Sequence, residues 1–541
     1  MLKPVQAKAR AGSRRRTLAP VEVANTPTSA DSYADKVLPL DRLATVCEGL
    51  RKQGKTIALC HGVFDLFHVG HLRHLTAARE HGDVLVVSIT ADEHVNKGPD
   101  RPAFTSELRS EVLAGLALVD YVAVVDAPSA VPSIQAVKPD RFVKGGEYIN
   151  PDKDITGKIV AEKALVEEFG GQIVFTNDIT FSSSNLLNKF FASHDEPARN
   201  YLAKLRGNGL EDRLASLFRK MENLRVVIVG ETIIDRYVYV DALGKAAKEN
   251  IIATLHRDEE IFAGGVIAVA NHLAAFCPNV ELLTVVGDPA HGATYESFCR
   301  EQLSPSIKPI FLHRRDGPTV QKTRFVEPTY VRKLFEVYHM DDSPLPESTK
   351  GEFKGLLAER LANADLAVVC DFGHGFIDKE VIRVMEETAP FLAVNAQSNA
   401  GNIGYNLIDK YRRADFVCID ATEARLAVRD KNANLADVVG QRLPQLVDCP
   451  NIIVTHGRSG CYAKTNGTVV HIPSFNSVVV DTVGAGDAFF ALAAPCLAAG
   501  SDCETAGFIG NIAGAIKVGI VGHRRYLTRL EIQQYVSTLL K

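Results

Sequence analysis

The stretch "HGVFDLFHVGHLRHL", residues 61–75, joins an apolar run to a segment with helical periodicity. The run before it, Thr-Ile-Ala-Leu-Cys at 56–60, is typical of a buried strand. Gly62 lets the backbone of the intervening turn approach a ligand closely, and the N-terminus of the following helix attracts anions. The stretch therefore predicts a strand–turn–helix unit that binds phosphate.

Two histidines of this stretch are candidate ligands. His68 and His71 are three residues apart on the first turn of the expected helix, so they share a face. Two imidazoles placed there would donate hydrogen bonds to a triphosphate and stabilise charge developing on the α-phosphorus. The alternatives are a structural histidine and a metal site, but a metal needs further ligands, and the sequence has no H-E-x-x-H motif.

The pattern around this stretch repeats. Short apolar runs alternate with amphipathic segments, first over residues 56–176 and again from Arg225 onward, which predicts βαβ units on parallel sheets. We expect an α/β fold with a first domain at 38–195, a polar helical connector at 196–222 and a second α/β domain at 223–541.

The composition restricts the class of protein. A chain of 541 residues with 46% hydrophobic and 23% charged residues is globular and too long for one ordinary core. The net charge of -4 gives no indication of nucleic-acid binding, and no apolar run approaches the roughly 20 residues that span a bilayer. Ten scattered cysteines without a C-x-x-C pair predict reduced thiols in the cytoplasm. Residues 1–37 are expected to form a flexible basic tail rather than a secretory signal.

A second motif, "DTVGAGDAFFAL", lies at 481–492. Backbone N–H groups of the turn Gly484-Ala485-Gly486 would form an anion hole for a transferring phosphoryl group. Asp487, on the first turn of the following helix, would take the proton of a hydroxyl nucleophile. The alternative is a carboxylate that only complements the helix dipole.

The first domain resembles the cytidylyltransferase-like nucleotidyltransferases, which have a Rossmann-like fold. "GVFDLFHVGH" is similar to their signature, and "KGPDRPAF" at 97–104, "RFVKGGEY" at 141–148 and "FSSSNLLNKF" at 181–190 follow in the family's order. The last motif has three serines where the family usually has Ser-Thr-Thr or Ser-Ser-Thr. The resemblance implies in-line attack of a sugar phosphate on the α-phosphorus of a nucleotide. It assigns phosphate binding to Gly62, Phe64, His68, His71, Lys97, Lys144, Ser182 and Ser183, while Arg109 is either a weaker phosphate ligand or part of a surface ion pair.

The second domain resembles the ribokinase-like (PfkB) sugar kinases over residues 223–541, most specifically through Asp-Thr-x-Gly-Ala-Gly-Asp. This resemblance implies a sugar kinase that uses ATP and Mg²⁺, with Asp487 as the base. It assigns sugar binding to Asp235, Gly264, Gly265, Lys322 and Arg324, and it places Asp371 near the reaction centre. Nucleotide binding is assigned to Thr455, Gly457 and Asn511. Water-mediated Mg²⁺ binding is assigned to Glu423.

The whole pattern is most similar to the bifunctional heptose kinase/adenylyltransferases, with the domain order swapped. Two positions depart from those enzymes: Ala268 replaces a sugar-binding asparagine, and Asp420 begins the Asn-x-x-Glu motif that ends at Glu423. The resemblance implies phosphorylation of a sugar, expected to be heptose 7-phosphate at C1, and then formation of an ADP-heptose-like product.

Two alternatives stay open. The transferase would act with CTP on another phosphorylated polyol or sugar, beside a kinase of different specificity, or the kinase domain would be a non-catalytic binding or dimerisation module. The expected partners are a small sugar phosphate and a nucleotide, with neither nucleic acid nor membrane, and the expected assembly is a homodimer.

Overall fold

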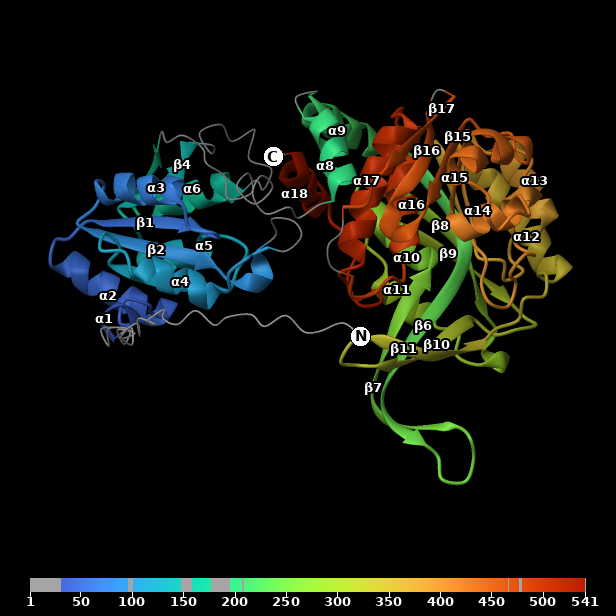
Figure 1. Ribbon diagram of the computed structural model, residues 1–541, viewed down its shortest axis with the longest axis horizontal. Coiled ribbons are helices and arrows are strands. Elements are labelled where there is room, and N and C mark those ends of the chain that lie inside the picture. Colours follow the sequence, from blue (N-terminus) through green and yellow to red (C-terminus); the bar gives the residue numbers. More distant parts are fainter. Residues whose placement is uncertain are drawn as a thin grey trace, which may run out of the picture.

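The structure is a computed structural model that describes residues 31–95, 101–146, 158–176, 195–206, 209–465, 467–475 and 479–540. Lys97, Ser182 and Ser183 lie outside the described residues, as does most of the predicted tail. Figure 1 shows two α/β bodies, one built from the N-terminal part of the chain and the other from the remainder. Among the helices that are described, none is both long enough and apolar enough to cross a bilayer.

The N-terminal body is a parallel sheet with the strand order β3-β2-β1-β4-β5. Its central strands are almost completely buried because helices cover both faces, which is why they read as continuous apolar runs. The elements are α1 (Asp31–Ala34), α2 (Leu40–Lys52), β1 (Ile57–Gly62), α3 (Val69–Arg79), β2 (Val84–Thr90), α4 (Ser106–Ala114), β3 (Tyr121–Val125), α5 (Val131–Val137), β4 (Arg141–Gly145), α6 (Lys158–Glu168) and β5 (Gln172–Thr176).

The strand order places the expected phosphate site. Helices α3 and α4 pack on one face of this sheet, and α2, α5 and α6 pack on the other. The chain moves outward from β1 to β3 and then returns to pair β4 with β1. In open parallel sheets, ligands bind at the carboxyl ends of the strands where the order reverses. Gly62 ends β1 and Lys144 lies near the end of β4, so both are at this crevice.

The end of the predicted tail is corrected by the structure. Val37 forms an isolated parallel bridge with Val122, and the ammonium of Lys36 donates to the carbonyl oxygens of Leu116 and Val119, at 3.1 and 2.9 Å. These contacts attach the chain to the domain before residue 38, since they satisfy backbone groups at the edge strand β3.

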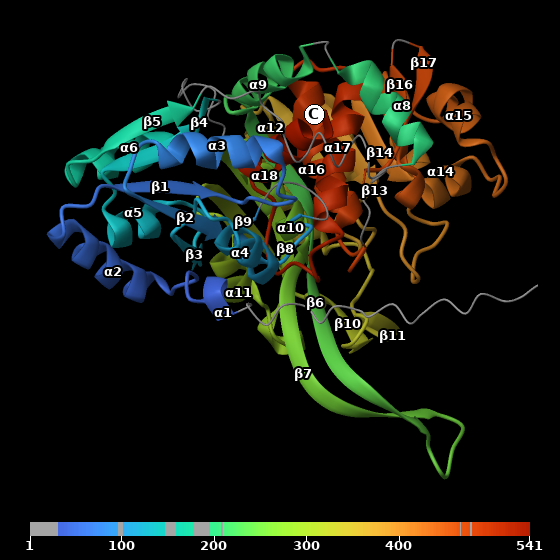
Figure 2. The same cartoon turned by 60° about the vertical axis from the view of Figure 1, so that its left-hand side comes forward.

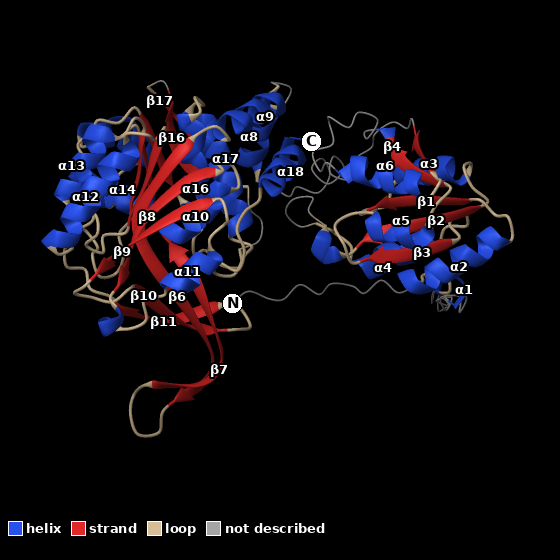
Figure 3. Cartoon of the chain, turned by 180° about the vertical axis from the view of Figure 1, so that it is seen from behind, coloured by secondary structure: helices blue, strands red, loops and turns tan. Residues whose placement is uncertain are grey.

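The C-terminal body is built around one large sheet in which β9-β8-β6-β12-β13-β14-β15-β16-β17 are neighbours. Figure 3 shows helices on both faces. The strands are β6 (Arg225–Lys245), β7 (Ile252–Gly265), β8 (Asn279–Gly287), β9 (Ile307–Arg314), β10 (Val320–Glu327), β11 (Arg332–His339), β12 (Leu366–Asp371), β13 (Leu392–Ala396), β14 (Phe416–Asp420), β15 (Asn451–Thr455), β16 (Cys461–Thr465) and β17 (Thr468–Ile472). The principal helices are α10 (Val266–Ala274), α11 (Glu296–Gln302), α12 (Glu347–Leu361), α13 (Lys379–Thr388), α14 (Ala421–Ala427), α16 (Ala485–Ala498), α17 (Cys503–Lys517) and α18 (Arg529–Leu540).

Strand β6 belongs to two sheets. Its first part pairs in parallel with β8 and β12, whereas its second part pairs antiparallel with β7 and in parallel with β10. The hairpin of β6 and β7 therefore extends beyond the main sheet, as Figure 2 shows. With β10 and β11 it forms a smaller sheet, which we call the lid sheet.

The expected connector is helical, but it is not a free linker. Helices α8 (Glu196–Leu205) and α9 (Leu210–Met221) have buried apolar faces that include Tyr201, Leu214 and Phe218. These faces join the same core as α10, α16, α17 and α18. The exposed faces of the two helices are polar, which explains the polar composition of the segment. Their apolar side chains recur with a period of 3.6 residues and therefore form one face that packs on the core.

Because α9 is part of this core, Phe218→Ala should destabilise the C-terminal domain. Phe218 is 1% exposed and meets the ring of Phe276 edge to face, so its truncation should cost about 3–5 kcal/mol. Chemical denaturation of the full chain measures this loss. Tyr330→Ala, at an 83% exposed position, is the matched control, and equal stability of both variants would contradict the packing of α9.

Candidate active sites

In the N-terminal domain, His68 and His71 lie at the start of α3. His68 is the N-cap residue, and its Nδ1 accepts a hydrogen bond from the N–H of Gly70 at 3.1 Å. The rings of His68 and His71 are stacked, with their centroids 4.0 Å apart. Burial lowers the pKa of His68, so the ring is neutral at pH 7, and its buried Nε2 makes no hydrogen bond within the described chain. The structure therefore brings the two predicted histidines together at a helix N-terminus.

The turn before α3 is strained and held from outside. Phe64 and Leu66 have φ angles of 51° and 47°, in the left-handed region that non-glycine residues rarely adopt. The carboxylate of Asp65 accepts hydrogen bonds from the N–H groups of Ala103 and Phe104, at 2.9 and 3.1 Å. These bonds fasten the turn to the loop before α4.

Arg109 is neither a phosphate ligand nor part of a surface ion pair. It is 2% exposed, and its guanidinium donates to the carbonyl oxygens of Val63 and Thr90, at 2.6 and 2.9 Å, and to Asp92 at 2.6 Å. A third carbonyl, that of Phe104, accepts from its Nε. The rigid fork of donors thus joins three loops at the carboxyl end of the sheet, a role that the sequence does not reveal.

Lys144 lies in the same crevice but has a carboxylate partner. Its ammonium is 2.8 Å from Glu162, and both side chains are buried. A phosphate would therefore compete with Glu162 for this ammonium. The one cluster of suitable metal ligands in the described residues is Glu93, His94 and Asp126, and it includes neither His68 nor His71.

In the C-terminal domain, the Gly-Ala-Gly turn leads directly into α16. Gly484 has a φ of 76°, and Asp487 lies on the first helical turn. Its Oδ1 accepts a hydrogen bond from the amide of Gln397 at 2.8 Å. Burial raises the pKa of Asp487, while Gln397 and His523 act in the opposite direction. A carboxylate with a raised pKa at a helix start is suited to accept a proton.

The predicted sugar-binding residues gather beside it. Asp235 on β6 is paired with Arg324 on β10, and its Oδ2 is 3.6 Å from Nε2 of His523. Burial raises the pKa of Asp235, but Arg324 and His523 outweigh burial and hold this pKa well below its usual range. Lys322 on β10 is the strand partner of Asp235 on β6. The carboxylates of Asp235 and Asp487 both act to raise the pKa of Lys322.

Two glycines make room for this cluster. A Cβ at Gly264 would lie 2.2 Å from Oδ2 of Asp235. Gly265 has a φ of 56°, and a Cβ there would lie 2.6 Å from the carbonyl oxygen of Glu231. Glycine is therefore required at both positions, because a side chain would collide with Asp235 or with the backbone of Glu231.

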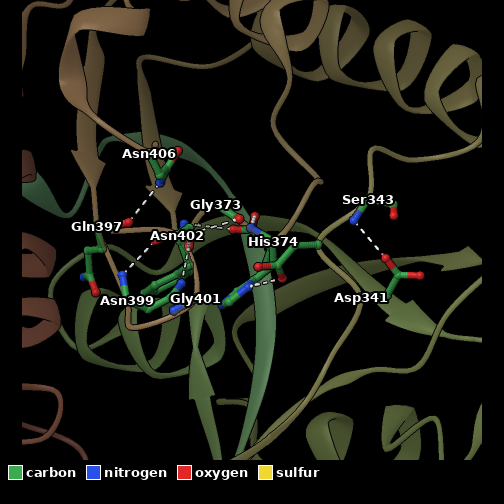
Figure 4. A network of polar contacts seen from close by, with 12 residues as sticks. Asp341, Ser343, Gly373, His374, Gln397, Asn399, Gly401, Asn402 and Asn406 are labelled. Atoms are coloured by element: carbon green, nitrogen blue, oxygen red, sulfur yellow. Dashed lines mark hydrogen bonds and ion pairs between the residues drawn. The ribbon is translucent and has the colours of Figure 1, made fainter. Parts of the chain in front are cut away.

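Asp371, predicted to lie near the reaction centre, is held by buried polar contacts. Its side chain is fully buried. The carboxylate accepts hydrogen bonds from the hydroxyl of Tyr411 at 2.6 Å and from the amide of Asn406 at 3.1 Å. It also forms an ion pair with Lys410 at 2.5 Å. Its carboxylate anchors the loops after β12 and β13, whose polar contacts are drawn in Figure 4. Adjacent Glu231 accepts from the N–H of His374 at 3.0 Å, and burial together with Asp371 raises its pKa to about 7.

His374 is a buried polar residue near the predicted site residue Lys322, and the sequence analysis assigned it no role. Its Nδ1 is 2.8 Å from Oδ1 of Asp342, and its Nε2 is buried without a hydrogen bond in the described chain. Burial lowers the pKa of His374, and the nearby Lys322 adds to this effect. Its only signal in the sequence is its position between the glycines of "DFGHGF".

The predicted nucleotide-binding residues have mixed outcomes. Thr455 ends β15 and Gly457 follows with a φ of 49°, so both lie on the loop before β16. The side-chain amide of Asn511 donates to the carbonyl oxygens of Ile472 and Pro473, at 3.2 and 3.1 Å, so it joins α17 to the end of β17, and its role in nucleotide binding stays a prediction.

The two departures from the heptose kinases have structural explanations. Asp420 is the N-cap of α14 and forms a capping box with Glu423, whose carboxylate also accepts from the N–H of Ser398 at 2.8 Å. Asparagine at this position would cap the helix equally well. Burial and Asp420 raise the pKa of Glu423 to about 8. Ala268 is fully buried within α10.

Comparison with known proteins agrees with this geometry. Residues 223–527 match the pfkB family of carbohydrate kinases. The chain belongs to the pfkB family. Residues 59–189 match the cytidylyltransferase-like family, so this pfkB protein carries a second enzyme-like domain before its kinase domain.

Curated relatives have the name "Bifunctional protein HldE". The protein from Desulfatibacillum aliphaticivorans is 41% identical over 155 residues, which are 28% of this chain and 30% of the relative. The protein from Geobacter metallireducens is 35% identical over 187 residues, 33% of this chain and 36% of the relative. The match thus spans about a third of the length of these relatives. Among solved structures, a ribokinase from Thermotoga maritima is 19% identical with a TM-score of 0.44, over 58% of this chain and 99% of that chain.

The role assigned to Arg109 predicts that Arg109→Met weakens the N-terminal domain. Loss of its buried hydrogen bonds and its bond to Asp92 should cost roughly 2–4 kcal/mol and lower nucleotidyl transfer, since the turn before α3 loses its support. Thermal unfolding and a transferase assay measure the two effects. Arg42→Met on the exposed side of α2 is the control, and wild-type stability of the Arg109 variant would disprove the role.

The space around Asp235 predicts that Gly264→Ala impairs sugar binding. Because the added methyl group would meet Oδ2 of Asp235, the KM for sugar should rise by about tenfold or more, the equivalent of about 1.4 kcal/mol. Gly355→Ala in α12, where a Cβ meets nothing within 4 Å, is the control. An unchanged KM for the Gly264 variant would remove Asp235 from the sugar site.

Proposed function

We propose that this pfkB protein activates a sugar in two steps. The C-terminal domain phosphorylates a sugar phosphate with ATP, and the N-terminal domain then couples the sugar 1-phosphate to a nucleotide. The proposed substrate is heptose 7-phosphate, phosphorylated at C1, and the product is ADP-heptose or a close relative. The HldE relatives and the two matched families support this proposal.

The observation that carries the kinase step is the convergence of Asp487 and the Gly-Ala-Gly turn with Asp235, Lys322 and His523. In this step the sugar hydroxyl oxygen bonds to the γ-phosphorus of ATP, the bond from that phosphorus to the bridging oxygen breaks, and the hydroxyl proton moves to Asp487. Backbone N–H groups at the start of α16 and the ammonium of Lys322 stabilise the transferring phosphoryl group.

The transferase step uses the N-terminus of α3. An oxygen of the sugar 1-phosphate bonds to the α-phosphorus, and pyrophosphate leaves with the bridging oxygen. His68 and His71 face the phosphates, and the helix N-terminus contributes its partial positive charge. No protein nucleophile is needed, since positioning and charge stabilisation are sufficient.

A magnesium ion fits the kinase site. Glu423 and Asp487 are carboxylates within electrostatic reach of each other, and Mg²⁺ in phosphoryl-transfer sites is bound through carboxylates, waters and substrate phosphates. Glu423 would hold it through water, because both of its oxygens already accept backbone N–H groups. Bound there, the ion would neutralise charge on the nucleotide phosphates.

Two alternatives concern the activity of the kinase domain and the nucleotide that the transferase domain uses. Ala268 and Asp420 suggested a non-catalytic kinase domain; the burial of Ala268 in α10 and the capping box of Asp420 with Glu423 support the catalytic proposal, and kinase assays decide between the two. ATP and CTP are distinguished by experiment: mass spectrometry of sugar-nucleotide products formed from heptose phosphates with either nucleotide identifies the base.

Assembly and location complete the proposal. Apolar side chains of the lid sheet are exposed, among them Leu243, Ile252, Phe335 and Val337, and pairing of two lid sheets in a homodimer would cover them. All ten cysteines are free and buried, which suits the reducing cytoplasm.

His71→Ala should abolish nucleotidyl transfer and leave kinase turnover intact. The loss of one imidazole at the phosphate-facing helix turn is expected to lower the transfer rate by about 10²–10³-fold. Pyrophosphate release measures transfer, and ATP consumption with sugar measures the kinase. A folded variant that still forms sugar nucleotide at the parent rate would refute the assignment.

Asp487→Asn should abolish sugar phosphorylation while the chain still converts supplied sugar 1-phosphate to sugar nucleotide. The amide is nearly isosteric but cannot accept the hydroxyl proton. Circular dichroism and the transferase assay on the same preparation control for folding. Near-parent phosphorylation by this variant would show that Asp487 is not the base.

A further inference from the structure

Lys517 is a fully buried lysine at the end of α17. Its ammonium donates to three backbone carbonyl oxygens: Gly522 at 2.7 Å, Val483 at 2.8 Å and Ile520 at 3.5 Å. No carboxylate of the described residues forms an ion pair with it. An ammonium has three donors and no acceptor, so this carbonyl cage uses all of its hydrogen-bonding capacity.

The cage lies directly beneath the anion-binding turn. Val483 precedes Gly484, and a Cβ at Gly484 would lie 3.2 Å from Cε of Lys517 and 2.7 Å from Cε1 of His523. Burial lowers the pKa of Lys517 to about 8, whereas Asp481 and Asp487 act in the opposite direction. The side chain therefore carries its charge at pH 7, close to the start of α16.

The peptide geometry links the cage to the site. In a trans peptide the C=O and the following N–H point in opposite directions. When Lys517 draws the carbonyl oxygen of Val483 toward itself, the N–H of Gly484 turns away from the cage. The same relation holds between the carbonyl of Gly522 and the N–H of His523, whose ring approaches Asp235.

We propose that Lys517 is a built-in cation of the phosphoryl-transfer site. It is a positioning residue that orients the Gly484 turn and the His523 loop together, and its charge favours the anion that the turn binds. This inference rests on the proposed kinase function and names the group that organises its anion hole.

The cage has a chemical consequence that can be tested. Rings of backbone carbonyl oxygens also replace the hydration shell of K⁺, and NH₄⁺ has the same head group as lysine. Removal of the side chain in Lys517→Ala should therefore leave a cage that a free K⁺ or NH₄⁺ ion enters. Lys517→Met keeps most of the side-chain volume and should exclude the ion.

The experiment measures sugar phosphorylation in choline, sodium, potassium and ammonium chloride at one ionic strength. The parent should have the same kcat in all four salts. In choline, Lys517→Ala should lose about 10²-fold in kcat, in the range found when one oxyanion donor is removed, and it should regain a large part in K⁺ or NH₄⁺. Lys517→Met should stay low in every salt.

Lys350→Met is the matched control. Lys350 is also buried, but it is paired with Glu347 and Asp378 at the start of α12. Its loss should lower stability without a salt-selective change in kcat. If Lys517 were only structural, folded Lys517 variants would behave like this control, and that result would overturn the proposal.

A second readout is independent of kinase activity. K⁺ and NH₄⁺, compared with choline, should raise the Tm of Lys517→Ala by several degrees, with no such difference for the parent or Lys517→Met. If the parent phosphorylates no sugar, the proposed function fails, while the Tm series still decides whether the cage takes a cation. Equal Tm values for Lys517→Ala in all four salts would overturn the cage.

Discussion

The C-terminal domain depends on the continuity of β6 across two sheets. Val226–Gly230 pair with β12 in the core, and Asp235 follows only a few residues later, where the strand has joined the lid sheet. A strand hydrogen-bonded on both sides cannot shift its register without breaking a ladder. The position of Asp235 relative to the central sheet is therefore set by backbone pairing rather than by a flexible loop.

Hydrogen bonds and ion pairs of buried charged side chains join other segments of the C-terminal domain to this strand. Asp481, the first residue of the motif at 481–492, accepts a hydrogen bond from Tyr237 of β6 at 2.8 Å and forms an ion pair with Lys333 of β11 at 2.5 Å. Asp235 forms an ion pair with Arg324, and the charged ammonium of Lys517 donates its hydrogen bonds to backbone carbonyl oxygens. Because an unpaired buried charge is costly, each of these contacts fixes a separate segment in place.

In the N-terminal domain, hydrogen bonds from neighbouring loops hold the turn before α3 in place. The turn before α3 contains two strained residues, and strain of about 1–3 kcal/mol at each persists only where the surroundings impose it. Asp65 and Arg109 supply that support through hydrogen bonds to neighbouring loops. A rigid turn keeps His68 and His71 oriented, which under the proposed function reduces the reorganisation needed in the reaction.

The sequence by itself determined the local units. The alternation of apolar runs and amphipathic segments over residues 56–176 correctly predicted βαβ units on a parallel sheet, which the structure forms from β1 to β5 and the helices between them. The turns at 62–71 and 484–487 were also predicted, because glycine spacing and a following helix define a phosphate-binding turn over a few residues.

Only the tertiary structure decided which buried groups the polar residues of these motifs contact. Arg109, Asp371 and Asn511 stand in site-like motifs, yet their side chains satisfy buried carbonyl and hydroxyl groups. The sequence analysis assigned no role to His523, His374 and Lys517, yet the fold brings them close to the predicted site residues. A buried polar group must find its hydrogen-bond partners in space, and those partners lie on segments far away in the sequence.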